Sequence, residues 1–292
     1  MLLIAMTAAA RAQGAWVGDA KSLTTDLAYH YAPSSATVIS PELSGPPAPT
    51  QNHTITLSAE YVPIENLAIE AEIPFALVKF DGTTPHLPPG AWDDHNFHET
   101  LTDFRGGVRY QVLDQPYVAV SPYVAVTIPM QSYEVNGFAV GGRHLKLAHV
   151  GVSVGRSLDP ILPSLYLMAT YELTVGEHYK QNEQTAKLSQ GRSDVEAQLG
   201  YLLLGGDLDI AAVFNWRISH GGIEFKNFAM LPPELTSFHD PILKEEYMFL
   251  GGNVSYAVSQ KLSVGVVARF FLRGFNTRDQ SLFGVNTTWR WF

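Results

Sequence analysis

The sequence predicts an all-β fold, an antiparallel transmembrane β-barrel of about 12 strands, and three observations lead to it. Segments of about ten residues alternate between apolar and polar positions, as strands with two different environments do. Short and long connections alternate between these segments. Large aromatic side chains gather near the two ends of the segments, where a membrane protein meets the lipid headgroups.

Size and composition restrict the alternatives. The chain has 292 residues, of which 46% are hydrophobic and 16% charged, so it can bury a core and is not disordered. No apolar run of about 18 residues predicts a transmembrane helix. The net charge of -9 argues against nucleic acid as a partner, and the absence of cysteine excludes disulfides and thiolate chemistry.

The first residues resemble the end of a secretory signal. Residues 1–12 are apolar and then small, and Ala10-Arg11-Ala12 fits an A-x-A cleavage site. We therefore expect a signal-peptide remnant over residues 1–12 and a single barrel domain over residues 13–292.

Apolar residues at every second position mark the expected strands. The clearest case runs through Val264, Val266, Ala268 and Phe270. A soluble sandwich or barrel can show the same alternation, so the connections and aromatic residues must discriminate. The expected strands are residues 23–31, 55–61, 67–77, 102–112, 118–128, 145–156, 165–173, 195–203, 208–218, 248–258, 262–272 and 281–292.

The connections favour an outer-membrane barrel of a Gram-negative bacterium, which has short periplasmic turns and long extracellular loops. The first two long connections are rich in proline and can either cap the barrel mouth or cover its outside. Short connections are expected at residues 63–66, 114–116, 159–163, 205–207 and 259–261, and long ones at 32–51, 79–97, 130–143, 176–192 and 220–242.

Aromatic residues on the apolar parity predict two membrane-interface girdles. Trp289 and Trp291 stand in the last strand, where the barrel-assembly machinery would read the terminal sequence, although Phe292 is one residue out of phase with them. The expected periplasmic girdle comprises Tyr61, Tyr110, Tyr117, Tyr201, Tyr256, Trp289 and Trp291, and the opposite girdle comprises Tyr29, Phe75, Trp216 and Phe270.

The other parity faces the lumen and carries the charges. Strand heights predict one group of Glu60, Glu70 and Arg109, and a second group of Glu172, Glu196 and Arg217. In the last strand, Arg290 is expected at the height of Asp26. The expected lumen or solute-path residues are Glu60, Glu70, Glu72, Arg105, Arg109, Glu172, Glu196, Arg217, Arg269, Tyr247, Phe249 and Phe271.

Two interpretations of these charges remain open. They can pair across a partly dry lumen, which the modest width of the barrel favours, or form a constriction that selects solutes. The aromatic lumen residues can fill space or contact an apolar solute.

An enzyme or a metal site has weak support. Some outer-membrane barrels are phospholipases with His and Ser two residues apart, but no H-x-S occurs, and His149 and Ser153 lie four apart on the lumen parity. Residues 92–99 (WDDHNFHE) contain His and Asp at spacings that can bind a divalent metal, yet such loop clusters are usually solvated. We expect no enzyme activity, no metal and no cofactor.

The chain resembles the MetA-pathway phenol-degradation family of outer-membrane barrels, often described as transporters. The resemblance rests on residues 103–110 (DFRGGVRY), the turn that follows, the stretch from Tyr117 to Pro129, and the ending Trp289-Arg290-Trp291-Phe292, which is similar to a W-R-F ending with one inserted residue. It covers about half of the chain and implies uptake of hydrophobic or aromatic compounds.

We therefore expect an outer-membrane channel for passive uptake of small solutes, hydrophobic or aromatic ones among them. Glu70, Arg105 and Arg109 would shape the path together with Glu172, Glu196 and Arg217. The alternative is a plugged barrel with a structural or partner-binding role, and a lipid-modifying enzyme comes third. The expected partners of the protein are outer-membrane lipids, the barrel-assembly machinery and a small-molecule solute.

Overall fold

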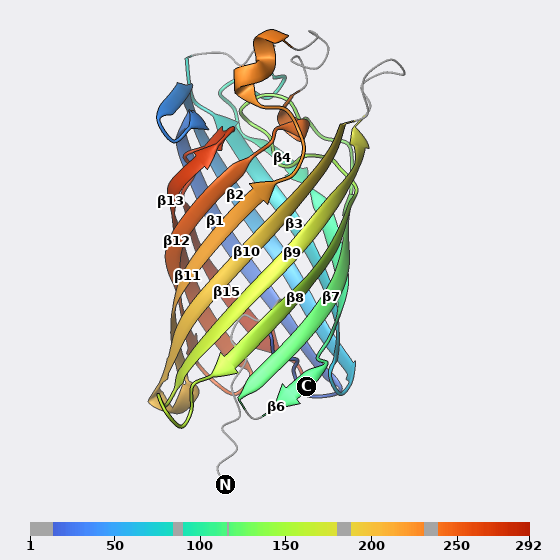
Figure 1. Cartoon of the computed structure of the whole chain (residues 1–292), viewed down its shortest axis with the longest axis vertical. Helices are drawn as coiled ribbons and strands as arrows, with labels where there is room; N and C mark the ends of the chain where they lie inside the picture. The colour runs from blue at the N-terminus through green and yellow to red at the C-terminus, as the bar shows by residue number, and fades with distance from the viewer. Residues whose placement is uncertain (1–13, 84–89, 116, 180–187, 231–238) are drawn as a thin grey trace.

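The computed structural model describes residues 14–83, 90–115, 117–179, 188–230 and 239–292. Within this part of the chain, 12 long antiparallel strands form one closed barrel, which confirms the predicted fold (Figure 1). These strands are β1 (Ser22–Ser40), β2 (Leu43–Ile64), β3 (Leu67–Phe80), β5 (Asp103–Tyr110), β7 (Val118–Pro129), β8 (Leu147–Ser157), β9 (Leu165–Tyr179), β10 (Leu188–Leu203), β11 (Leu208–Ser219), β12 (Glu246–Ala257), β13 (Leu262–Phe275) and β15 (Leu282–Arg290).

Each strand pairs with its neighbour in sequence, and the barrel closes where the first strand meets the last. At this seam, Thr24 of β1 pairs with Arg290 of β15, and Tyr31 pairs with Phe283. The short strands β4 (His98–Leu101), β6 (Leu113–Gln115) and β14 (Thr277–Arg278) extend the sheet at its rims. The pairing of β1 with β15 closes the sheet on itself. Among the described strands, no long sheet edge is therefore left unpaired.

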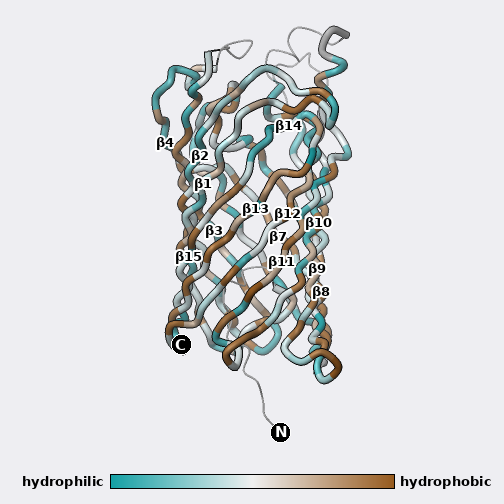
Figure 2. Tube along the Cα trace, turned by 90° about the vertical axis from the view of Figure 1, so that its left-hand side faces the viewer, coloured by the Kyte–Doolittle hydropathy of each residue, from teal (hydrophilic) through white to brown (hydrophobic). Residues whose placement is uncertain are grey.

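The alternation along each strand separates an apolar outer wall from a polar lumen. On β13, Val264, Val266, Phe270 and Leu272 are exposed on the outside. Figure 2 shows hydrophobic residues recurring along the strands of the barrel wall. Exposed apolar side chains on neighbouring strands form a continuous belt, the surface that a hydrocarbon layer requires. No helix of the described residues is long and apolar enough to cross a membrane.

The two ends of the barrel differ as the connections predict. The C-terminal residue and the tight turns lie at one end, which we call the short-turn end (Figure 1). One of these turns places Asn66 at a φ of 66°, a left-handed conformation that asparagine tolerates. Another contains the 3-10 helix η1 (Leu204–Gly206). The other end, the long-loop end, carries η2 (Phe225–Met230) and η3 (Asp240–Ile242).

The expected loop over residues 32–51 is wrong. The ladder between β1 and β2 continues through this region, with Ala36 paired to Pro47 and Val38 to Ser44, and a tight tip joins Ser40 to Leu43. Register shifts interrupt this part of the ladder, and such irregularities accommodate proline, which cannot donate a backbone hydrogen bond. The prolines therefore lie within an extended hairpin. Pro85, Pro88 and Pro89 of the second expected cap lie outside the described residues.

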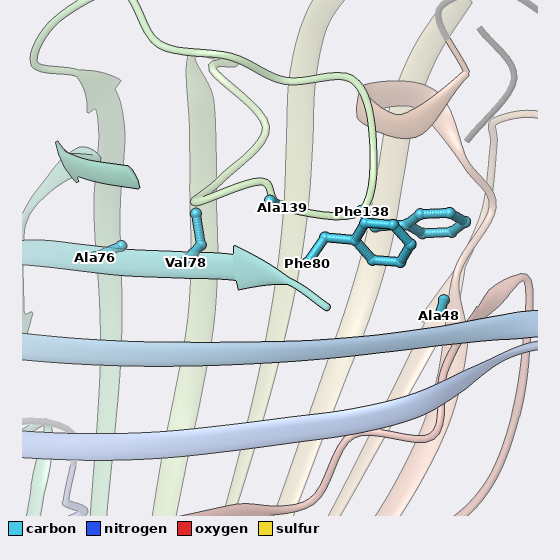
Figure 3. Close-up of a cluster of buried hydrophobic side chains, with 6 residues drawn as sticks. All are labelled: Ala48, Ala76, Val78, Phe80, Phe138 and Ala139. Carbon is cyan, nitrogen blue, oxygen red and sulfur yellow. The ribbon is translucent and has the colours of Figure 1, made fainter. Parts of the chain in front are cut away.

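The connection between β7 and β8 folds across the long-loop end. Phe138 stacks on Phe80 with ring centroids 4.8 Å apart, and Ala139 packs in the same buried cluster (Figure 3). Asp93 accepts hydrogen bonds from the backbone N–H groups of Phe138 and Ala139, at 2.9 and 2.8 Å. These contacts fix the connection in place. The remaining members of the cluster are Ala48, Ala76 and Val78.

Candidate functional site

The lumen near the short-turn end is crossed by ion pairs around Arg109. Its side chain is 1% exposed, and its guanidinium pairs with Glu60 and with Glu70, whose Oε1 lies 2.9 Å from Nε. Glu60 and Glu70 are register partners on β2 and β3, and Ala68 of β3 pairs with Arg109 of β5. The structure therefore brings together the three residues whose heights on neighbouring strands matched in the sequence.

A segment before β1 lies in the same part of the lumen. Gly14 accepts a hydrogen bond from Arg109 through its carbonyl oxygen. The Ser121 hydroxyl donates to the Ala15 carbonyl at 2.5 Å, and the Val17 N–H donates to Gln111 Oε1 at 2.7 Å. We call Gly14, Ala15, Trp16 and Val17 the N-terminal segment.

Trp16 fixes this segment against the wall. Its ring meets Tyr166 edge to face, with centroids 6.3 Å apart. A Cβ atom on Gly155 would overlap the Trp16 ring, so the absence of a side chain at Gly155 makes room for the indole. The sequence prediction missed this segment, because nothing in its pattern distinguishes a chain inside the barrel from one outside.

Higher in the lumen, Glu172 of β9 collects several donors. Arg105 of β5 reaches both carboxylate oxygens, at 2.5 and 3.4 Å, and the Tyr123 hydroxyl donates at 2.9 Å. Nδ1 of His149 lies 2.9 Å from Glu172, while its Nε2 lies 2.8 Å from the Thr127 hydroxyl. A carboxylate with this many partners is held rigidly across four strands.

The expected grouping of Glu172, Glu196 and Arg217 does not form. Arg217 instead contacts Asp194 at 2.6 Å, because Asp194 is its register partner across β10 and β11. Arg192 shares the same carboxylate at 3.2 Å. Asp194 and Arg192 were missed because β10 begins seven residues before the expected strand, at Leu188.

Glu196 and Arg269 meet through an amide. The Asn215 Nδ2 group donates to Glu196 at 2.7 Å, and Asn215 Oδ1 accepts from Arg269 Nε at 3.1 Å. Arg269 also donates to the carbonyl of Gly252 at 2.9 Å. Glu72, the register partner of Arg105, lines the same region of the lumen.

Aromatic rings cover the lumen side of β12 and β13. Tyr247 and Phe249 lie 4.9 Å apart, and Phe249 and Phe271 lie 5.9 Å apart, both pairs near edge to face. We call Tyr247, Phe249 and Phe271 the aromatic ladder. The Arg217 guanidinium lies 4.9 Å from the Tyr247 ring centroid, a cation–π contact that joins the ladder to the charged residues.

Three cavities follow one another along the lumen. A vestibule of about 720 Å³ at the long-loop end and a chamber of about 550 Å³ below it share Arg217 and Arg278 in their linings. The chamber in turn shares Glu196 and Arg269 with a lower pocket of about 300 Å³, whose lining includes Trp16. The cavities thus lead from the long loops down to the N-terminal segment.

Other expected contacts differ in the structure. Arg290 pairs with Asp19 and not with Asp26, because Asp26 accepts hydrogen bonds from Asn286 Nδ2 at 2.8 Å and from the Thr288 hydroxyl at 2.6 Å. Thr288 is the register partner of Asp26, whereas Arg290 pairs with Thr24, two residues away. These two bonds tie the seam between β1 and β15.

In the loop weighed as a metal site, residues 92–99, polar side chains form hydrogen bonds with one another. Asp94 binds His98 at 2.8 Å and Asn96, and these hydrogen bonds lower the pKa of Asp94 below its usual value. His95 stacks on Phe80, with ring centroids 6.0 Å apart. Across the described residues, no three His, Asp or Glu side chains lie together as a metal site would require.

The two residues weighed as a catalytic pair bind other groups. His149 contacts Thr127, Glu172 and Thr174, while the Ser153 hydroxyl lies 2.9 Å from Thr170. Their side chains face the lumen, where they contribute to the polar lining.

Of the residues expected in the girdle at the long-loop end, Tyr29, Trp216 and Phe270 are exposed and Phe75 is half-buried. Five tyrosines at the short-turn end are exposed, as are Trp289 and Trp291, whose rings lie 6.0 Å apart. The tyrosines are Tyr61, Tyr110, Tyr117, Tyr201 and Tyr256.

No protein-family model and no curated protein matches the sequence. Solved structures match over nearly the whole chain. The COG4313 outer membrane channel from Pseudomonas putida F1 aligns with a TM-score of 0.71 at 8% identity, over 94% of this chain and 97% of that one. The NanC porin aligns with a TM-score of 0.52 at 9% identity, over 91% and 98%. The translocator domain of the autotransporter NalP from Neisseria meningitidis aligns with a TM-score of 0.53 at 10% identity, over 93% and 89%. The chain has the fold of bacterial outer-membrane β-barrels.

Proposed function

We propose that this protein is an outer-membrane channel for the passive uptake of small solutes. The observation that carries the proposal is the row of three cavities, linked by shared lining residues, from the vestibule to Trp16. The similarity in fold to an outer membrane channel and to a porin supports it. Outer-membrane barrels have short periplasmic turns and long extracellular loops, so the long-loop end would be extracellular and the short-turn end periplasmic.

The solutes are small and include hydrophobic or aromatic compounds. The aromatic ladder gives the chamber an apolar surface beside its guanidinium groups, and such a surface contacts an apolar ring while the polar groups orient it. The resemblance to the MetA-pathway phenol-degradation family, with its implied uptake of aromatic compounds, supports the same class.

Outer-membrane lipids and the barrel-assembly machinery are the other partners that we propose. The exposed apolar belt would contact lipid, and β15, with Trp289 and Trp291 exposed on its outer face, would be the strand that the assembly machinery recognises.

Liposome swelling tests the proposal. Phenylalanine is a small aromatic zwitterion that crosses a lipid bilayer slowly, and we expect proteoliposomes to swell in its presence faster than protein-free liposomes. Raffinose, a larger polar sugar, serves as the size control and should give slower swelling. If neither phenylalanine nor KCl crosses the protein-containing membrane, the channel does not exist.

The N-terminal segment favours a second candidate function, a plugged barrel with a structural or partner-binding role. It occupies the periplasmic end of the lumen and is bound by Arg109, Ser121 and Gln111. Conductance distinguishes the two. In a channel narrowed by this segment, Trp16→Gly should raise the single-channel conductance in planar bilayers, because it removes the ring that packs against Tyr166.

Trp289→Ala is the matched control for this test. It removes an indole from the outer wall, so the conductance should stay the same. If both variants conduct no ions, the plugged barrel is the better description.

A further inference from the structure

The passage between the vestibule and the chamber has an unusual charge. Five of the described residues line both cavities, and we call them the neck: Arg217, Tyr247, Thr277, Arg278 and Gln280. Two are guanidinium groups, the other three carry hydroxyl or amide groups, and none is a carboxylate. A solute that moves from one cavity to the other passes these hydrogen-bond donors.

The carboxylates close to the neck offset its positive charge in part. Glu245 pairs with Arg143, and Asp240 accepts a hydrogen bond from the Gly137 N–H. Asp194 is shared by Arg217 at 2.6 Å and Arg192 at 3.2 Å, so one negative charge faces two positive ones. The Nε atom of Arg192 is buried and, although close to Asp194, is not aligned to donate a hydrogen bond to it. Within the described chain, no residue accepts a hydrogen bond from the terminal nitrogens of Arg217.

Arg278 is held at the neck by neutral groups. Its terminal nitrogens donate to the carbonyl oxygens of Phe138 and Gly137 at 2.5 and 3.2 Å, and its guanidinium lies 5.9 Å from the Phe138 ring centroid. Among the described residues, no carboxylate oxygen lies within 4.0 Å of it as an ion pair. Carbonyl groups position the guanidinium, while Asp240 and Glu245 act on its charge from beyond ion-pair distance and do not occupy its donors. A buried guanidinium held in this way attracts a planar anion.

The aromatic ladder begins at the neck and continues into the chamber. Tyr247 lines both cavities and Phe249 lines the chamber, with the two rings 4.9 Å apart. An anionic group at the neck would therefore leave its organic part beside these rings. The pairing of guanidinium groups with an aromatic surface suits an aromatic acid better than an inorganic ion.

We propose that the neck is a binding site for the carboxylate of a small aromatic monoanion, held by Arg217 and Arg278 with its ring against the aromatic ladder. Benzoate has the required chemistry. The described lining of the chamber contains five arginines and four carboxylates, so its formal excess is one positive charge, which suits a monoanion. This proposal rests on the proposed function and names the class of solute that the channel prefers.

Bi-ionic reversal potentials in planar bilayers test the preference. At pH 8 we compare potassium benzoate with benzylammonium chloride, two solutes of similar size and opposite charge. The wild-type channel should favour benzoate over benzylammonium by about tenfold, the ratio that about one charge-assisted hydrogen bond provides. Equal permeability of the two ions would overturn the proposal.

Variants at the neck locate the effect. Arg217→Gln should reduce the preference to roughly equal permeability, and it leaves Asp194 paired with Arg192. Thr277→Asp adds a negative charge to the neck and should reverse the preference for benzoate. Thr277→Asn introduces a neutral side chain of the same shape as aspartate and should retain the preference. Arg290→Gln removes a positive charge from the periplasmic rim, where Arg290 pairs with Asp19, and should also retain it. A preference unchanged by Thr277→Asp would overturn the assignment.

Binding in detergent separates this proposal from the channel itself. Equilibrium dialysis with radiolabelled benzoate should show binding to the wild-type protein that Arg217→Gln weakens by about tenfold. If no ion crosses the bilayer while this binding remains, the channel function is wrong and the site stands. If ions cross without discrimination and benzoate does not bind, the channel stands and the site is wrong.

Discussion

Arg109 shows how the lumen tolerates charge. It is among the largest fully buried side chains of the described residues, and it contacts two carboxylates and a backbone carbonyl. A buried charge without a partner is expensive, so each member of this group depends on the others. The pattern of residues predicted Glu60, Glu70 and Arg109 at one height because these strands keep a regular register.

Removing Arg109 should destabilise the barrel. Arg109→Ala leaves Glu60 and Glu70 facing each other without a cation, at a cost of about 3–5 kcal/mol. We expect a lower midpoint of unfolding in urea, measured by tryptophan fluorescence in detergent.

Arg290→Ala is the control for this prediction. Arg290 pairs with Asp19, whose side chain is 81% exposed, and an exposed pair contributes about 0–1 kcal/mol. Equal effects of the two variants would contradict the interpretation that burial makes the Arg109 group important.

At the level of elements, the sequence predicted which strands exist better than where they end. Alternation of period two predicts a strand where its two faces meet different environments, here lipid and the polar lumen, so the core of each strand was recognised. Beyond the membrane both faces of a strand meet water or loops, and the alternation is lost. For this reason residues 32–51 of the β1–β2 hairpin and the start of β10, with Arg192, were assigned to loops, and Asp194 was left outside the expected strand.

The N-terminal segment could not be predicted for a different reason. Trp16 packs against Tyr166 on β9, and Ala15 bonds with Ser121 on β7, more than a hundred residues away in sequence. No local pattern encodes such contacts. The neck likewise joins residues from β11, β12 and β14, and only the closed barrel brings these together.

A substitution on the outer face of β13 tests the membrane-facing assignment. Val266 is 52% exposed and lies between Val254 and Val285, which are also exposed. Val266→Lys should cost about 2–4 kcal/mol, because a lysine at the midplane of the bilayer must desolvate. Stability is measured by urea unfolding in lipid vesicles.

Ser263→Lys on the same strand is the control. Ser263 lines a shallow pocket at the short-turn end, where a lysine reaches water, so the change should be small. A larger loss for Ser263→Lys than for Val266→Lys would mean that the faces of β13 are assigned wrongly.

At the level of the whole molecule, a closed barrel accommodates both the many charged residues of the chain and its many exposed apolar residues, because the charges line the lumen and the apolar side chains face outward. Closure leaves no long strand edge among the described residues, and the charges pair inside. The folded barrel should migrate faster than the heated protein on a gel run in dodecyl sulfate. Identical migration of the heated and unheated samples would contradict the barrel.

The seam between β1 and β15 should contribute measurably to the stability of the folded barrel against heat in dodecyl sulfate. Asp26→Ala removes the acceptor of Asn286 and Thr288, and we expect a loss of about 1–3 kcal/mol. The temperature at which the fast-migrating band disappears should therefore fall. Ser58→Ala is the control, since Ser58 pairs with Asp26 on the opposite side of β1, within a hairpin that is local in sequence.

The same seam has a consequence for the order of folding. Every other pair of neighbouring long strands is a hairpin of residues close in sequence, whereas Thr24 must find Arg290 across almost the entire chain. Contacts of high sequence separation form slowly, because the entropy of the intervening chain must be lost first. The hairpins can therefore form early, and lateral closure of β1 on β15 should be the slow, final step. Variants of Asp26 should then slow the appearance of the folded band more than variants of Arg109 do, relative to their effects on stability.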